Sequence, residues 1–78
     1  MNQEKLNQII GNNIKKYRNK CIINGKIMTQ EKLAELINTS VSLIGNLESN
    51  KIKQGISISN LHKISIVLDV PINKFFEE

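Results

Sequence analysis

The chain has 78 residues, a formal net charge of +4, a hydrophobic fraction of 40% and three aromatic side chains, one tyrosine and two phenylalanines. Its one cysteine, Cys21, excludes an internal disulfide, and no apolar run approaches the roughly 20 residues that span a bilayer. The length predicts a single domain over residues 1–78, and fourteen isoleucines predict an aliphatic core. A polar N-terminus and a lone thiol predict a cytoplasmic protein that makes no contact with a membrane.

The positive charge is concentrated at the start of the chain. Residues 1–28 carry six cations and one acid, residues 29–55 carry three of each, and residues 56–78 carry two cations and three acids. A basic front and a slightly acidic back suit a protein that presents one face to a polyanion. Ordinary solubilising charge explains the same excess equally well, so charge alone does not identify the partner.

The first predicted helix runs from about Gln3 to Lys20. Its apolar residues recur at steps of four, four and three, the spacing of one helical face, at Leu6, Ile10, Ile14 and Tyr17. The segment from Asn19 to Met28 follows, and its Asn24-Gly25 dipeptide is a strong signal for a tight turn. Because an isolated hairpin is only marginally stable, we expect an ordered loop here and keep a small hairpin as the alternative.

Two short helices are predicted next, each with a polar N-cap and an asparagine at its end. Thr29 caps a helix that stops near Asn38, and Ser40 caps a helix that stops at Asn50. Hydroxyl side chains satisfy free backbone N–H groups at a helix start, and asparagine tolerates the left-handed conformation that ends a helix. The buried residues of these two helices are expected at Leu33, Ala34, Ile37, Ile44 and Leu47.

The last part of the chain, residues 57–76, predicts two further helices for the core and for dimerisation. Ser57 caps the fourth helix and Asp69 ends it. The expected buried stripe of this helix is Ile58, Leu61, Ile64, Val67 and Leu68. Pro71 opens a short fifth helix through Phe76, because its fixed φ suits a first helical turn. This end holds more apolar groups than so short a helix can bury, so part is expected in the core and the remainder at a homodimer interface made by Val70, Ile72, Phe75 and Phe76.

The two short helices meet the geometric requirement of a helix-turn-helix over about residues 29–49. Ala34 is small enough to permit a close crossing, and Ile44 and Leu47 face back toward the first of the two helices. The opposite face of the second helix is then free, and a helix of this width fits the major groove of DNA, which is about 12 Å wide. The outward residues are Val41, Ser42, Gly45 and Asn46.

The ordered set of segments resembles the Cro/phage-repressor (Xre-type) helix-turn-helix family over nearly the whole chain. The matching stretches are Ile10-Gly11, Ile14 to Arg18, Thr29 to Glu35, Ser42 to Glu48, Leu61 to Ile64 and Leu68 to Pro71. The resemblance implies an all-α, compact five-helix, lambda-repressor-like domain that binds operator DNA as a two-fold homodimer and regulates transcription, in many members as a repressor. The size and the HKI…L…P…FF ending are similar to those of restriction-modification controller proteins; phage and mobile-element repressors and antitoxins share the size.

Four residues on the free face are the candidates for reading DNA bases. Asn46 can bind adenine at N6 and N7, and Val41 can pack against a thymine methyl group. For Ser42 a base contact and a contact with water or phosphate have equal support. Gly45 either lets the helix backbone approach DNA closely or is present by drift, since glycine weakens a helix interior. A solvated helix face is the alternative for all four, and base contact is favoured for Asn46.

The phosphate contacts are expected at both ends of the helix-turn-helix. By the resemblance, Gln30 at the start of the first short helix should hold a phosphate with its side chain and backbone amide, as helix N-termini do. Ser40 is primarily an N-cap, with a phosphate contact from its hydroxyl at even odds. Lys51 and Lys53 follow the recognition helix and are slightly favoured as phosphate contacts over a solvated loop.

Arg18 is the one arginine in a chain with ten lysines, which suggests a need for planar, bidentate geometry. Glu48 stands at the position where the resembled family has its partner. We therefore expect a structural, non-catalytic Arg18–Glu48 ion pair that joins the first helix to the third. Two unrelated surface charges are the alternative.

The sequence contains no pattern for catalysis or for a bound cofactor. His62 and Cys21 each stand alone, and there is no metal-ligand cluster, nucleophile–base pair, phosphate-binding glycine loop or carboxylate dyad. We therefore expect a DNA-binding regulator and not an enzyme, with double-stranded DNA and a second copy of the chain as partners and with no cofactor, metal or small-molecule ligand. The alternative is a protein-interaction module such as an antitoxin or immunity factor, which the apolar C-terminus and the long Asn19–Met28 loop support.

Overall fold

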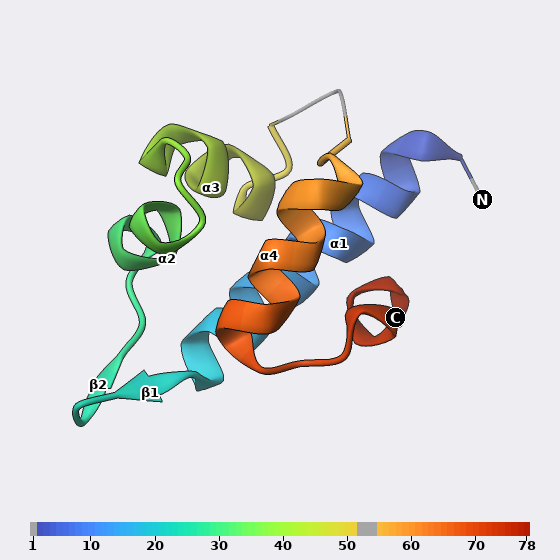
Figure 1. Ribbon diagram of the computed structural model, residues 1–78. Helices are drawn as coiled ribbons and strands as arrows, with labels where there is room; N and C mark the ends of the chain where they lie inside the picture. Colours follow the sequence, from blue (N-terminus) through green and yellow to red (C-terminus); the bar gives the residue numbers. More distant parts are fainter. Residues whose placement is uncertain (1, 52–54) are drawn as a thin grey trace.

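The computed structural model describes residues 2–51 and 55–78 (Figure 1). The elements in chain order are α1 (Gln3–Lys20), β1 (Ile22–Ile23), β2 (Lys26–Ile27), α2 (Gln30–Leu36), α3 (Val41–Glu48), α4 (Ile58–Leu68) and the 3-10 helix η1 (Ile72–Phe76). In Figure 1, α4 crosses in front of α1. The helices α2 and α3 lie together to one side of this crossing, and the two strands project beyond the helices. None of the helices in these residues is long and apolar enough to cross a membrane.

The α-helices begin where local sequence places a hydrogen-bond acceptor. In each case the N-cap side chain accepts a hydrogen bond from the backbone N–H three residues later, and these side chains belong to Asn2, Thr29, Ser40 and Ser57. Such a bond satisfies one of the backbone donors that a helix start leaves free. The predicted starts of α2, α3 and α4 are therefore confirmed.

The ends of α2, α3 and α4 also lie where the sequence predicts them. Asn38 (φ 58°), Asn50 (φ 61°) and Asp69 (φ 57°) each adopt the left-handed conformation at or just after the end of a helix. Short polar side chains tolerate this conformation better than branched ones do. No glycine is needed at these three positions, because asparagine and aspartate take the same backbone shape.

The segment between α1 and α2 is a two-stranded antiparallel hairpin, so the expectation of an ordered loop is wrong and the alternative is correct. Ile22 pairs with Ile27 and Ile23 with Lys26. The two turn residues, Asn24-Gly25, both have positive φ, at 52° and 77°, as a two-residue turn of primed type requires. The hairpin is stabilised at its base, where the N–H of Met28 donates to the carbonyl of Cys21 and the Met28 side chain is buried.

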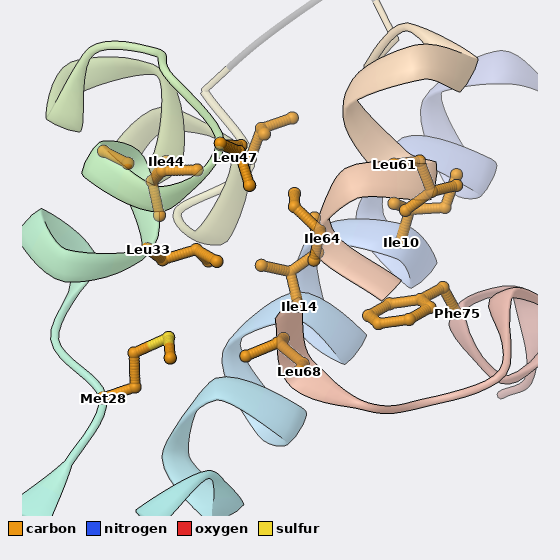
Figure 2. Packing of buried hydrophobic residues seen from close by; sticks show 12 residues of the cluster. Ile10, Ile14, Met28, Leu33, Ile44, Leu47, Leu61, Ile64, Leu68 and Phe75 are labelled. Carbon is orange, nitrogen blue, oxygen red and sulfur yellow. The ribbon is translucent and has the colours of Figure 1, made fainter. Parts of the chain in front are cut away.

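The core lies where α1, α2, α3, α4 and η1 meet. Figure 2 shows Ile14 of α1 and Ile64 of α4 between the side chains of α2 and α3 on one side and Phe75 on the other. The buried cluster is aliphatic apart from one methionine and one phenylalanine, and it comprises Ile10, Ile14, Met28, Leu33, Ala34, Ile37, Ile44, Leu47, Leu61, Ile64, Leu68 and Phe75. The expectation of a largely aliphatic core is therefore confirmed.

One residue of the expected stripe on α4 lies outside the core. Ile58 is 81% exposed, because it occupies the first position of the helix at the edge of the buried face. Ile56, just before the helix, packs against the core instead. Spacing alone therefore assigns the buried face of α4 correctly from Leu61 onward and fails at its first turn.

The C-terminal segment differs from the expected fifth α-helix in that it forms a 3-10 helix of five residues, η1. So short a segment forms few i→i−4 hydrogen bonds, and Pro71 contributes no N–H. Instead, the buried Asn13 side chain on α1 donates to the carbonyls of Phe75 (2.9 Å) and Glu77 (2.8 Å) and fastens the segment to the body. The described residues thus contain four α-helices and η1, not five α-helices.

Phe75 completes the core and is not available for an interface. Its side chain is 0% exposed, and its ring meets that of Tyr17 edge to face with 5.5 Å between the centroids. The expectation that Phe75 contributes to a dimer interface is therefore wrong, because a side chain without exposed surface cannot contact a second chain.

Candidate nucleic-acid interface

The turn between α2 and α3 locks the two helices together. Ala34 is buried on α2, and Ile44 and Leu47 are buried on α3. The N–H of Thr39 donates to the carbonyl of Ala34 at 2.9 Å and closes the turn. Because each helix alone is too short to be stable in water, this apolar contact holds α3 in place.

The opposite face of α3 is open to solvent in the described part of the chain. Val41 is 42% exposed, Ser42 and Asn46 are exposed, and Gly45 is half-buried. These four residues carry no charge, and two of them offer side-chain hydrogen-bonding groups. With 8 residues, α3 is roughly 12 Å long at 1.5 Å per residue. The face is thus a narrow ridge with polar hydrogen-bonding groups and no charge of its own.

The buried ion pair expected from the sequence attaches α3 to α1. Arg18 Nε donates to Glu48 Oε2 at 2.7 Å, and Arg18 Nη2 donates to Glu48 Oε1 at 2.9 Å. The side chains of Arg18 and Glu48 are 10% and 3% exposed. The hydrogen bond with Glu48 raises the pKa of Arg18 above its usual value, with burial acting in the opposite direction. The guanidinium therefore keeps its charge at every physiological pH.

The arginine of the ion pair also contacts the segment between β2 and α2. Arg18 Nη1 donates to the backbone carbonyl of Met28 at 2.8 Å, so one arginine links α1, α3 and the end of the hairpin. A second constraint acts at the crossing of α1 and α3, where a Cβ on Gly11 would overlap the carbonyl oxygen of Leu47. Glycine is therefore required for this close approach.

Gln30 makes a contact that the sequence does not reveal. Its side chain is half-buried at the first position of α2, and its Nε2 donates to Glu48 Oε1 at 3.0 Å. The residue expected to hold a phosphate is therefore attached to the residue expected to be structural. No local pattern indicates this, because the two residues lie 18 positions apart on different helices.

The other expected phosphate contacts lie on two sides of α3. Ser40 is exposed and its hydroxyl caps α3 by accepting from the N–H of Leu43 at 3.2 Å. Lys51 is exposed after α3, and Lys53 lies outside the described residues. Of these three residues, the one that is both charged and described, Lys51, therefore lies at the margin of the face, while the face itself is neutral.

A second surface, apolar in character, lies on α4 and the segment that follows it. Phe76 is 46% exposed, and Val70 and Ile72 are half-buried against the core. Ile66, which is 64% exposed on the side of α4 that faces away from the core, belongs to this surface and is not among the residues predicted from the sequence. Its offset from the Leu61, Ile64 and Leu68 stripe is the signal that could have found it. Ile66, Val70 and Ile72 line one shallow hollow.

In the described residues, no group of three or more His, Cys, Asp or Glu side chains is placed to hold a metal ion. Cys21 is half-buried at the start of the hairpin, and His62 is exposed on α4. Neither belongs to a cluster that the structure brings together.

Comparison with known families shows a match over most of the chain. The family model HTH_3, described as helix-turn-helix, matches residues 14–75, from the middle of α1 into η1. Among curated proteins, no sequence matches the chain. The matched range includes α2, the turn and α3, and it also includes both partners of the buried ion pair.

Proposed function

Since the chain belongs to the Cro/C1-type (Xre-type) helix-turn-helix family, we propose that it binds a specific operator sequence in double-stranded DNA and regulates transcription. The observation that carries the proposal is the open, neutral face of α3 on a helix whose other side is fixed by Ile44, Leu47 and the Glu48 ion pair. A rigid ridge of this width can enter the major groove without rearrangement.

The roles of individual residues follow from their positions on this face. Asn46 binds adenine through its carboxamide, Val41 packs on a thymine methyl group, and Ser42 adds a hydrogen bond. Gly45 lets the helix backbone come close to the base edges. These contacts supply the sequence preference.

Phosphate contacts at the margins hold α3 in register. Gln30 donates from the start of α2, Ser40 from the turn, and Lys51 and Lys53 from the segment after α3. Hydrogen bonds to phosphate position a protein on DNA without reading the sequence. The lysines also make the affinity depend on salt, because each neutralised phosphate releases counterions.

The operator is a near-palindrome that is bound by a homodimer. Support comes from the hollow that the exposed Ile66 and the half-buried Val70 and Ile72 line, and Phe76 is a further exposed apolar side chain in the C-terminal segment. Such a patch in a small domain is typical of a protein-protein contact. A two-fold axis there would place two copies of α3 one DNA turn apart, roughly 34 Å. Restriction-modification control is the narrower form of the proposal, and neighbouring endonuclease and methyltransferase genes would support it.

Selection of bound sequences from random DNA tests the function directly. We expect a two-fold symmetric motif, and we expect Asn46→Ala to reduce discrimination at one base pair of each half-site by about 1–3 kcal/mol. Asn19→Ala, at an exposed asparagine in the last turn of α1, is the matched control and should leave the motif unchanged. An unaltered preference in the Asn46 variant would remove the base assignment.

A second candidate function is favoured by the hairpin. Ile22, Ile23 and Ile27 are 58%, 39% and 54% exposed, which is unusual for a two-stranded element that nothing covers in the described residues. Apolar groups in this arrangement suit binding of a partner protein, as in an antitoxin or immunity factor. DNA binding that vanishes with salt and shows no sequence preference would favour this function over the first.

A further inference from the structure

We propose that Glu48 is a positioning residue for DNA binding, which holds the Gln30 carboxamide ready to donate to a phosphate. The inference rests on the proposed function and adds a role to an ion pair that otherwise only joins helices. The observation that carries it is the shared oxygen, Glu48 Oε1, which accepts from Arg18 Nη2 at 2.9 Å and from Gln30 Nε2 at 3.0 Å.

The carboxylate is itself held rigidly. Both oxygens of Glu48 accept from the planar guanidinium of Arg18, and the Glu48 side chain is 3% exposed. The guanidinium is held in turn by the carbonyl of Met28 at 2.8 Å. A bidentate pair of this kind fixes orientation as well as distance. Gln30 therefore bonds to an acceptor whose orientation is already set by two hydrogen bonds from Arg18.

The hydrogen bond to Glu48 uses one N–H group of the Gln30 side-chain amide and leaves the other for a phosphate oxygen. The amide nitrogen carries two N–H groups, and within the described residues one of them donates to Glu48. The second remains available to an oxygen of the DNA backbone. A free glutamine must lose rotamer freedom when it binds, whereas one already fixed in the free protein loses less. The contact with Glu48 thus prepares the donor before DNA arrives.

The position of the carboxamide matches this role. Gln30 Oε1 lies 3.6 Å from the point that a Cβ on Gly45 would occupy. Gly45 belongs to the outward face of α3, so the Gln30 side chain lies beside the recognition helix although it comes from α2. The absence of a side chain at position 45 keeps that space open.

The charge of Glu48 distinguishes a positioning role from a purely electrostatic effect on DNA binding. A carboxylate near DNA repels the phosphates, so removal of the Glu48 charge should strengthen binding if the residue has no other role. If Glu48 positions Gln30, Glu48→Gln should instead weaken binding, because a carboxamide puts an N–H group against the guanidinium and loses the bidentate geometry.

The experiment is a double-mutant cycle on operator affinity, measured by fluorescence anisotropy over a salt series with DNA selected by the wild-type chain. We expect Gln30→Ala and Glu48→Gln each to weaken binding about tenfold, the size of one hydrogen bond to a charged group. The double variant should be no weaker than the weaker single variant, because both changes remove the same contact. Gln30→Ala should leave the salt slope unchanged, since a neutral donor releases no counterion.

Glu35→Gln is the matched control for charge. Glu35 is an exposed carboxylate on α2 that meets Lys32 at 3.5 Å, and its removal changes the net charge by the same amount. This variant should bind DNA as well as the wild type or better. Equal tightening by Glu48→Gln and Glu35→Gln would overturn the inference.

A measurement on the wild-type chain does not depend on how a variant folds. We expect nuclear Overhauser contacts between the Gln30 carboxamide protons and the Glu48 side chain in the free protein; their absence would overturn the inference. Wild-type protein without any sequence preference for DNA would remove the proposed function together with the inference. Sequence-specific binding with additive effects of the two variants would remove the inference alone.

Discussion

The helices α3 and α4 are built alike on their inner sides and differ on their outer sides. Both begin at a serine N-cap and bury one aliphatic face. Outward, α3 presents the polar Ser42 and Asn46, whereas α4 exposes Ile66 (64%) next to polar residues such as His62. Packing in the core explains the residue types on the inner faces. The residue types on the outer faces therefore indicate what each helix binds. The polar ridge of α3 suits the hydrogen-bonding edges of bases, and the hollow that Ile66, Val70 and Ile72 line suits another protein surface.

The two helices are also fastened differently. The α3 helix is tied to α1 by the Arg18–Glu48 pair and by the close approach at Gly11. After α4 in the chain, the segment η1 is held by the apolar side chain of Phe75 and by two hydrogen bonds from Asn13. The first attachment depends on a charged pair and a steric fit, whereas the second depends on a buried aromatic ring and neutral hydrogen bonds. Substitutions that separate these two modes of attachment therefore test the comparison.

The largest effect is expected at the buried ion pair. Glu48→Ala should lower the free energy of unfolding by about 3–5 kcal/mol, because it leaves the Arg18 guanidinium buried without its partner. Urea denaturation measures this change. Glu35→Ala removes the carboxylate of an exposed pair on α2 and should change stability by less than about 0.5 kcal/mol. Similar losses for both variants would show that burial of the pair is unimportant.

An intermediate effect, with opposite signs, is expected at two helical glycines. Gly11→Ala should destabilise the fold by about 1–3 kcal/mol, because the new methyl group overlaps the Leu47 carbonyl oxygen. Gly45→Ala should stabilise it by up to about 1 kcal/mol, because alanine favours a helix and the nearest atom, Gln30 Oε1, is at an ordinary 3.6 Å. Thermal unfolding gives both values.

Measuring the operator affinity of the Gly45→Ala variant extends the comparison of the two glycines. A more stable protein with weaker operator affinity would show that the backbone of α3 approaches the DNA at this position. Unchanged affinity would show that DNA binding does not require glycine at position 45. A destabilised Gly45→Ala variant would contradict the open space described beside α3.

An effect on dimer formation alone, without a change in the fold, is expected on the outer side of α4. Ile66→Ser should raise the dimer dissociation constant about tenfold, which is roughly 1.4 kcal/mol of lost burial. Ile58→Ser removes an even more exposed isoleucine at the other end of the helix and should leave the constant unchanged. Sedimentation at micromolar concentration measures both. Monomer alone at every concentration, with or without DNA, would remove the dimer from the proposed function.

Interactions that join distant segments were the hardest to predict. The ion pair was expected because a lone arginine stood out among lysines and the family resemblance supplied its partner, 30 residues away. The Gln30–Glu48 hydrogen bond and the need for Gly11 were not expected, since neither leaves a pattern in nearby sequence. The sequence predicts Phe75 at an interface, because hydropathy does not distinguish a side chain buried in the core from one buried between two chains.

The sequence by itself determined where the helices begin and end and which face of each is apolar. Those properties depend on local groups, such as the hydroxyl of Ser40 and the left-handed backbone of Asn38, and on periodic spacing. Only the tertiary structure decided that the hairpin forms, that η1 is a 3-10 helix, that Phe75 is core and that Gln30 meets Glu48. Each of these depends on which segments the folded chain brings into contact, and a linear pattern does not record that.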